Sequence, residues 1–176
     1  RGPRGTGFLF ISDRILRGNF EPLFIDMRGA EWTDANEYER RPDGRRFEEW
    51  EMPYPLIVGC ATAADYAMTV GLETIRDRNA ALGNLVRNKI TGMGLRLLDR
   101  GHKLSSIITV QIPGKESSFI LNNLRKRNIN TSIAQHSSAI LDFDAKGVTW
   151  ALRISPHYYN TEEEVDTLIQ ALKEVV

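Results

Sequence analysis

Two apolar periodicities alternate along residues 61–176, and their order is the feature that most restricts how this chain folds. Apolar residues recur at helical spacing in some segments and at every second position in others. The predicted order is helix (61–90), strand (105–113), helix (115–127), strand (128–134), strand (148–155) and helix (161–176). The first of these segments fits one long helix or two helices in tandem. This order predicts a small, open-faced antiparallel sheet with helices on one face, the α+β variety of an α/β fold.

The last predicted helix has the clearest local signal. Thr161 is followed three residues later by Glu164, which is the pattern of a capping box. In a capping box the threonine hydroxyl accepts a hydrogen bond from the backbone N–H of the glutamate, whose carboxylate accepts one in return. Apolar residues then follow at helical spacing at Val165, Leu168, Ile169, Leu172 and Val176.

Residues 1–58 show much less regularity and are predicted to be a separate region from residues 59–176. A tight glycine turn leads into an apolar stretch, Phe8–Ile11, that is predicted to be a buried strand whose earlier partners lie upstream of Arg1. A long polar loop follows, and it contains the aromatic residues Trp32, Phe47 and Trp50. Because exposed aromatic rings are costly, we expect them to cover a surface of an absent part of the chain or of a second subunit.

The net charge of the protein is zero, so long-range electrostatic attraction to a charged partner is not expected. The 23 basic and 23 acidic residues cancel, which gives no reason to expect nucleic acid or an anionic membrane as partner. The arginine cluster of residues 40–46 is flanked by glutamates, so it is either a solvated loop or a site for an anionic ligand or partner chain. Cys60 is the only cysteine, and no apolar run is long enough to span a bilayer. We therefore expect a cytoplasmic protein.

Arg153 is the residue best placed for binding. Its neighbours Leu152 and Ile154 belong to the apolar face of the strand, so alternation turns Arg153 to the opposite face. An arginine there suits bidentate capture of a carboxylate or phosphate, but it also suits a surface ion pair, and the pattern favours neither. The three histidines lack metal-ligand spacing, and the six lysines stand in polar contexts. No catalytic residue and no metal site are therefore predicted within this chain.

Several motifs together resemble one enzyme family. The stretch "GPRGTGFLF" is similar to the glycine loop and strand that follow the catalytic lysine in class V aminotransferases. The stretch "RRFEEWE" and the following helix "GCATAADYAMTVGLETIRDR" resemble the segment that enters the C-terminal domain of these enzymes. The stretch "LRISPHYYNTEEEVD" resembles the strand, turn and helix that end that domain. The similarity is strongest to the isopenicillin N epimerase-like and cysteine desulfurase-like branch of these fold-type I, pyridoxal phosphate (PLP)-dependent enzymes.

The resemblance implies that residues 1–58 are a remnant of the large PLP-binding domain with its connecting loop, and that residues 59–176 are the C-terminal small domain. It also implies that residues upstream of this chain supply part of the active site. The lysine that binds PLP covalently and the aspartate that contacts its pyridine nitrogen would lie upstream of Arg1. Gly2, Pro3, Gly5 and Gly7 would form the loop beside that lysine. Arg153 would bind the α-carboxylate of an amino-acid substrate. The resemblance also implies a homodimer with shared sites, and a chain that is inactive by itself.

One departure from the family pattern concerns the loop that precedes the C-terminal domain. The family mostly has a Gly-Thr pair after Arg-Phe-Glu, and this pair reaches the cofactor phosphate of the neighbouring subunit. Here the residues are Glu49, Trp50 and Glu51, which argues against phosphate binding by this loop. The substrate and the reaction type, whether transamination, desulfuration, epimerisation or lyase chemistry, stay open.

A second hypothesis from another functional class fits the same pattern. The α+β region from Ala61 onward could be a stand-alone module for ligand binding or dimerisation, in which Arg153 holds an acidic effector. Such a module would be a well-behaved monomer or dimer, whereas a fragment would expose the apolar face of Phe8–Ile11 and the loop aromatics.

Overall fold

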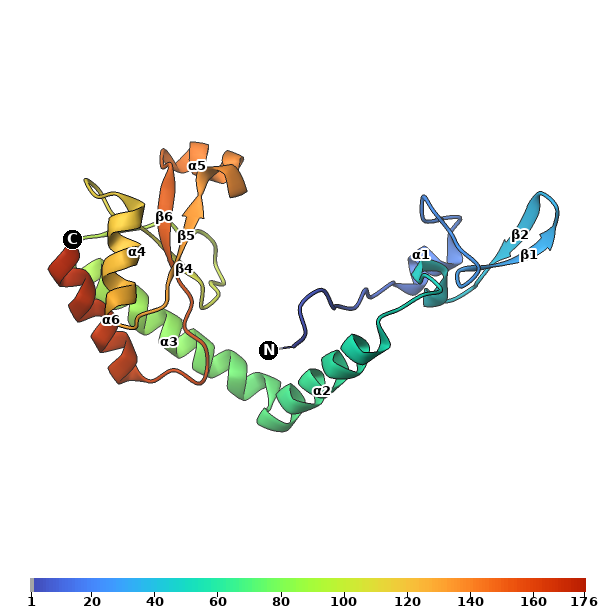
Figure 1. The fold of residues 1–176 in the computed structure, drawn as a ribbon, viewed down its shortest axis with the longest axis horizontal. Helices are drawn as coiled ribbons and strands as arrows, with labels where there is room; N and C mark the ends of the chain where they lie inside the picture. The colour runs from blue at the N-terminus through green and yellow to red at the C-terminus, as the bar shows by residue number, and fades with distance from the viewer. Residues whose placement is uncertain (1) are drawn as a thin grey trace. The chain divides into compact units, whose positions relative to one another are not determined.

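A computed structural model describes residues 2–176 of the chain, which form two units (Figure 1). The first unit extends to Thr69 and the second extends from Val70 to Val176. Most of the regular secondary structure, and nearly all of the buried apolar core, belongs to the second unit. Each unit is described separately.

The first unit contains short elements that are joined by long loops. Its helices and strands are α1 (Asp13–Arg17), β1 (Ala30–Asp34), β2 (Glu37–Arg40), a 3₁₀ turn (Gly44–Phe47) and α2 (Tyr54–Val70). β1 and β2 pair as an antiparallel hairpin in which Ala30 lies opposite Arg40, with a bulge after Trp32. The sequence predicts an irregular loop here. The hairpin is hard to foresee because its side chains are mostly exposed and show no apolar alternation.

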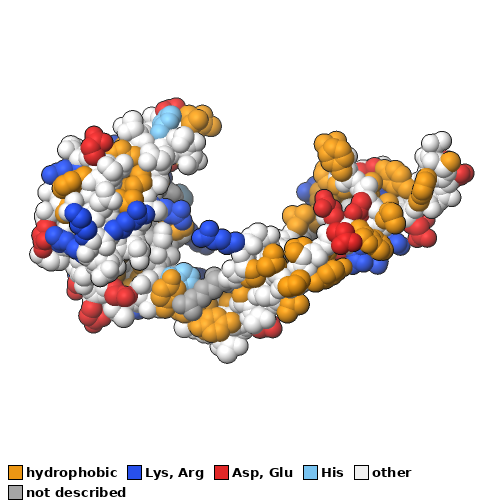
Figure 2. Space-filling view, viewed as in Figure 1, with side chains coloured by type: hydrophobic (Ala, Val, Ile, Leu, Met, Phe, Trp, Pro, Cys, Tyr) orange, Lys and Arg blue, Asp and Glu red, His pale blue; other side chains and the backbone are white. Residues whose placement is uncertain are grey.

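The predicted strand at Phe8–Ile11 has no partner strand among the described residues, and it stays a prediction because its expected partners lie upstream of Arg1. These residues are not part of any sheet, and Phe8 and Phe10 are 91% and 86% exposed. A segment becomes a strand only when a neighbouring strand accepts its hydrogen bonds, and the only sheet of the first unit is the β1–β2 hairpin. Figure 2 shows that hydrophobic side chains are spread over the surface of this unit.

One buried arginine holds the loops of the first unit together. Arg46 is only 3% exposed, although it carries a charge. Its guanidinium donates hydrogen bonds to the backbone oxygens of Leu16 (3.0 Å), Phe20 (3.0 Å) and Arg41 (2.9 Å). The planar fork of an arginine can bind three carbonyl groups at once, which the ammonium group of a lysine cannot match in geometry. Phe20 also stacks on Phe47, with 6.0 Å between ring centroids.

The second unit is a four-stranded antiparallel sheet with helices packed against it. Its elements are α3 (Leu72–Gly92), β3 (Arg96–Leu97), β4 (Ile108–Gln111), α4 (Ser117–Lys126), β5 (Ser132–Gln135), a 3₁₀ turn (His136–Ser138), α5 (Ile140–Lys146), β6 (Trp150–Ile154) and α6 (Glu162–Val175). The strand order is β3-β4-β6-β5. The predicted α+β fold class is therefore confirmed, and the predicted helical region at 61–90 is two tandem helices, α2 and α3.

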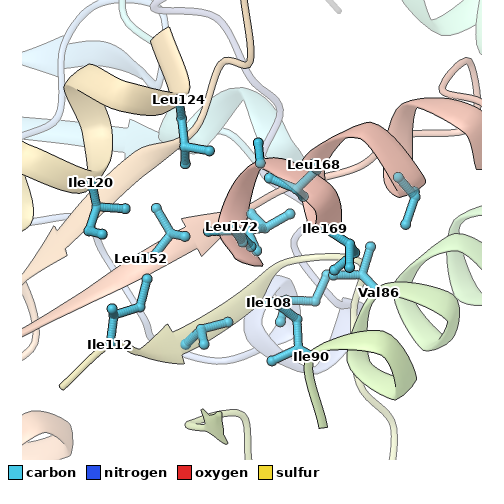
Figure 3. Packing of buried hydrophobic residues seen from close by; sticks show 14 of the residues in the cluster. Val86, Ile90, Ile108, Ile112, Ile120, Leu124, Leu152, Leu168, Ile169 and Leu172 are labelled. Carbon is cyan, nitrogen blue, oxygen red and sulfur yellow. The ribbon is translucent and has the colours of Figure 1, made fainter. Parts of the chain in front are cut away.

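The main core lies between one face of this sheet and the helices α3, α4 and α6 (Figure 3). Val110 and Leu152 lie opposite each other on β4 and β6, and both are fully buried. The core residues labelled in Figure 3 come from α3, β4, α4, β6, α6 and the position directly after β4: Val86, Ile90, Ile108, Ile112, Ile120, Leu124, Leu152, Leu168, Ile169 and Leu172. Burial of apolar side chains on this scale is what stabilises the unit.

The opposite face of the sheet is only partly covered. There Phe143 of α5 packs with Leu98, Val148 and Ala151 in a second, smaller apolar cluster. The sequence did not predict α5. This helix is seven residues long and is ended by Gly147, which adopts the left-handed conformation at φ 67°. So short a helix has too few turns to produce a readable period.

A buried ion pair fixes the segment between β3 and β4. Arg87 Nε on α3 donates to Asp99 Oδ2 at 3.0 Å, and both side chains are only 9% exposed. Arg87 Nη2 also donates to the backbone oxygen of Ser105 at 2.6 Å. The other carboxylate oxygen, Asp99 Oδ1, accepts from the backbone N–H of Thr109 at 2.8 Å and from its hydroxyl at 2.7 Å. This network ties α3, the 99–107 loop and β4 together.

The predicted capping box is present. Thr161 Oγ1 accepts from the backbone N–H of Glu164 at 3.2 Å, and Glu164 Oε2 accepts from the backbone N–H of Thr161 at 3.0 Å. These hydrogen bonds satisfy two amide groups at the start of α6 that have no partner within the helix.

Within residues 2–176, no single helix has the length and apolar composition needed to cross a membrane. The consecutive helices α2 and α3 meet those criteria only when they are taken together across the break between them.

Removing the charge of Asp99 should strongly destabilise the second unit. In the Asp99→Asn variant the buried Arg87 keeps its charge but loses its anionic partner, a change that costs about 3–5 kcal/mol. Urea unfolding of the purified protein measures this difference. Asp77→Asn is the matched control, because the Arg76–Asp77 pair is largely exposed and should contribute little. Equal unfolding midpoints for the two variants would contradict this account.

The Arg78–Glu162 pair should make stability fall in acid. Hydrogen bonds from Arg78, and then the backbone N–H of Glu162 itself, lower the pKa of Glu162 from 4.5 to about 2. Because the folded pKa is depressed, the stabilisation is complete above pH 4.5 and is lost as the pH falls toward 2. Glu162→Gln should therefore be less stable than the parent at pH 7 and equally stable near pH 2, as measured by urea unfolding at both pH values. Glu163→Gln, which removes the same charge from the adjacent position, should show a smaller difference at pH 7.

Candidate functional site

Arg153 lies in the interior of the sheet, on β6, and its side chain faces away from the main core. Leu152 and Ile154, on either side of it, are buried under the helices, whereas Arg153 is exposed. This is the orientation that strand alternation predicts. Within residues 2–176, no carboxylate forms an ion pair with Arg153 and no hydrogen bond involves its guanidinium. The guanidinium therefore keeps its donors available for an anionic ligand.

Two hydroxyl-bearing residues flank Arg153 across the sheet. Thr109 on β4 and Ser132 on β5 lie directly opposite Arg153 in the antiparallel pairing. Residues paired in this way point to the same face, with Cβ atoms about 5 Å apart. The three side chains thus form one polar row on the open face of the sheet, next to the apolar cluster around Ala151 and Phe143. The sequence pointed to Arg153 alone, because register between strands cannot be read from it.

The predicted glycine loop lies in the first unit and packs on α2. A Cβ on Gly59 would lie 2.8 Å from the ring of Pro3, and one on Gly2 would lie 3.5 Å from Ala63. The hydroxyl of Thr6 donates to the backbone oxygen of Pro3 at 2.7 Å, which closes the turn. Gly5 has φ 79°, a conformation that side-chain-bearing residues rarely adopt. A Cβ at Gly5 or Gly7 would meet nothing within 4 Å, so the loop is open on that side.

The chain offers only part of what PLP would need. All six lysines lie in the second unit, and the first unit, which contains the loop of Gly2, Pro3, Gly5 and Gly7, has no lysine in its sequence. Lys89 and Lys146 are engaged with Asp166 and Asp142. The open side of the glycine loop can approach a planar cofactor closely, but covalent attachment would require a lysine from outside these residues. The residues present therefore fit one wall of such a site.

The Glu49–Glu51 segment is held by its own backbone. The N–H of Trp50 donates to Asp26 Oδ2 at 2.7 Å, while Asp26 Oδ1 accepts from the N–H of Arg28 at 2.7 Å. These backbone hydrogen bonds, that from Trp50 above all, hold the pKa of Asp26 below its usual range. The N–H of Trp50 is therefore already occupied and unavailable to a phosphate. Trp50 itself is exposed, as is Trp32.

The arginine cluster of residues 40–46 is taken up by interactions within the first unit. Three of its arginines pair with acids: Arg40 with Glu21, Arg41 with Glu31, and Arg45 with Asp43. The fourth is the buried Arg46. Hydrogen bonds from Arg45 hold the pKa of the Asp43 carboxyl below its usual range. Within residues 2–176, each of these four arginines already has a partner, which favours a solvated loop over a site for an anionic ligand and leaves an interaction with a partner chain open.

A pocket of about 330 Å³ in the second unit is lined by residues of the 127–131 loop, by Ile154 and by the first half of α6. Its lining includes the apolar Leu168 and the amides Asn128 and Asn160, and it does not include Arg153. No group of three or more histidine, cysteine, aspartate or glutamate side chains gathers within residues 2–176.

Comparison with known proteins gives the chain a family. The aminotransferase class-V family model matches residues 1–168. A probable cysteine desulfurase from Xylella fastidiosa (strain 9a5c) is 26% identical over 178 residues, covering 99% of this chain and 42% of that protein. The chain thus spans about two-fifths of the length of the curated relatives that it matches.

Solved structures share the fold. The cysteine desulfurase CsdA (S-sulfonic acid) from Escherichia coli superimposes with a TM-score of 0.85 at 19% identity, over 99% of this chain and 43% of that one. The C-DES variant K223A, with glycine covalently linked to its PLP cofactor, gives a TM-score of 0.72 at 20% identity, over the same shares of the two chains. Since the family model covers nearly the whole sequence, the chain belongs to the aminotransferase class-V family.

Proposed function

We propose that this chain is the C-terminal part of a PLP-dependent enzyme that acts on an amino-acid substrate, and that Arg153 binds the α-carboxylate of that substrate. The observation that carries the proposal is the position of Arg153: it lies on an interior strand, faces the open side of the sheet, and has no anionic partner among the described residues. A planar guanidinium fixed in this way binds a carboxylate through two parallel hydrogen bonds.

The support for PLP comes from family membership and from the glycine loop. The C-DES variant binds PLP, and the loop of Gly2, Pro3, Gly5 and Gly7 leaves room for a cofactor at one side. PLP, when bound, supplies an electron sink for bonds at the α-carbon of an amino acid. The contribution of this chain would be to hold the substrate by its carboxylate and so to orient the bond that breaks. We expect the chain to be inactive without the lysine supplied from upstream.

The substrate class follows from the relatives as a hypothesis. Relatives named as probable cysteine desulfurases make L-cysteine, or an S-substituted cysteine, the amino acid to test first. Cys60 on α2 is the one thiol of the chain, and it is half-buried. We also propose that the enzyme works in the cytoplasm.

We also propose that the complete enzyme is a homodimer. The first unit exposes many large apolar side chains for its size, among them Phe8, Phe24 and Trp32. Exposed apolar surface on this scale usually marks an interface. Among the described residues of the first unit, Ala30 is the only buried apolar side chain, so no apolar core withdraws these side chains from water.

Replacing Arg153 should impair binding of the substrate in the complete enzyme. Arg153→Ala removes both donors to the carboxylate, which should raise KM and lower kcat/KM by the equivalent of about 2–5 kcal/mol. Arg153→Lys should retain part of the activity, because an ammonium supplies charge without the fork. Steady-state kinetics measures both effects. Arg125→Ala, which removes an exposed arginine from α4, is the control and should behave like the parent. Unchanged kinetic parameters in Arg153→Ala would refute this role.

Dimerisation should be visible in solution. Gel filtration of the complete enzyme should give twice the mass of one chain. The double variant Phe8→Ser/Phe24→Ser, which removes two exposed apolar rings, should shift the elution toward the monomer because the interface loses apolar area. A monomeric parent protein would contradict the proposal.

A further inference from the structure

The polar row on the open face of the sheet contains two hydroxyl groups beside Arg153, and they differ in what they can still bind. Thr109 and Ser132 are both paired directly opposite Arg153. Both therefore lie within reach of a ligand that is held by the guanidinium. Whether either can bind an anion depends on where the hydrogen of its hydroxyl already points.

The hydroxyl of Thr109 has already used its hydrogen. Thr109 Oγ1 donates to Asp99 Oδ1 at 2.7 Å, and the backbone N–H of Thr109 donates to the same oxygen at 2.8 Å. Arg87 holds the other oxygen of Asp99, so the carboxylate cannot turn away. A hydroxyl has one hydrogen, which means that Thr109 presents only lone pairs to its other neighbours. Lone pairs repel a carboxylate, and Thr109 therefore cannot help to bind one.

Ser132 is in the opposite situation. Ser132 is exposed and lies on β5, an edge strand of the sheet. Within residues 2–176, its side chain takes part in no hydrogen bond. The hydroxyl can rotate and direct its hydrogen toward a group seated on Arg153. It is thus the one hydroxyl of the row that can donate to an anion.

We propose that Ser132 is a second ligand of the substrate carboxylate, which donates its hydroxyl hydrogen to one carboxylate oxygen while Arg153 binds the carboxylate from the adjacent strand. The inference rests on the proposed function, because it assigns a partner to the same carboxylate. A hydroxyl donor beside the guanidinium adds a hydrogen bond that only a ligand with a carboxylate can accept, and it therefore increases the affinity for such ligands. It makes Ser132 a residue that selects amino acids over the corresponding amines.

The test compares two probes that differ only in the carboxylate: S-methyl-L-cysteine and 2-(methylthio)ethylamine. Binding of each probe to the complete, PLP-loaded enzyme is followed through the absorbance of the cofactor, a readout independent of turnover. Ser132→Ala should weaken binding of the amino acid about tenfold and leave binding of the amine unchanged. Ser118→Ala, an exposed serine on α4, is the control and should bind both probes like the parent.

A second pair of variants protects the test against a change in folding. Ser132→Thr and Ser132→Val have nearly the same shape and suit a strand, and they differ by one hydroxyl group. Ser132→Thr should bind the amino acid like the parent, while Ser132→Val should show the tenfold loss. Thermal unfolding of each variant establishes that the fold is intact.

Arg153→Ala separates failure of this inference from failure of the proposed function. Loss of preference for the amino acid in Arg153→Ala, with no change in Ser132→Ala or Ser132→Val, overturns the role of Ser132 and leaves that of Arg153. Unchanged preference in Arg153→Ala overturns both. Weakened binding of the amine in Ser132→Ala, to the same extent as the amino acid, also overturns the inference, because the effect would not act through the carboxylate.

Discussion

The alternation of β6 is the constraint on which the second unit depends. Leu152 and Ile154 pack into the main core between the sheet and its helices, so they fix both the position and the rotation of this interior strand. Once these two side chains point toward the helices, Arg153 between them must point the other way. A shift of the strand by one residue would put a charge in the core and two apolar side chains in water, which makes the register strongly defined. The stability of the core thereby sets the orientation of the candidate ligand-binding residue.

The orientation of Asp99, a carboxylate near Arg153, is also fixed by the hydrogen bonds that hold the fold together. Asp99 lies close to the row, yet it is held by Arg87 and Thr109 and does not pair with Arg153 within the described residues. If Asp99 were free to turn, it would compete with an acidic ligand for the guanidinium. The buried Arg87–Asp99 pair thus has two effects. It anchors the loop between β3 and β4, and it keeps the Asp99 carboxylate from pairing with Arg153.

Much of the second unit could be predicted from the sequence, since its elements are long enough to show a period. The α6 helix and its capping box, the burial of Ile120 and Leu124 on α4, and the outward orientation of Arg153 all follow from local patterns. The row of Thr109, Arg153 and Ser132 could not be predicted, because it depends on register between strands that are distant in the chain. The Phe8–Ile11 strand stays a prediction, because the partner strands that it needs would lie upstream of Arg1. The division at residue 58 stays a prediction.

Arg46 has a consequence for how the first unit tolerates change. Its guanidinium donates hydrogen bonds to the backbone oxygens of three segments, at Leu16, Phe20 and Arg41, and none to their side chains. Those segments can therefore exchange their side chains extensively while their course is preserved, provided that each carbonyl stays in place. Arg46 itself has no such freedom, because every alternative side chain would leave at least one of these inward-facing oxygens without a donor. We therefore expect substitutions of solvent-facing side chains in these loops to be tolerated better than any substitution of Arg46.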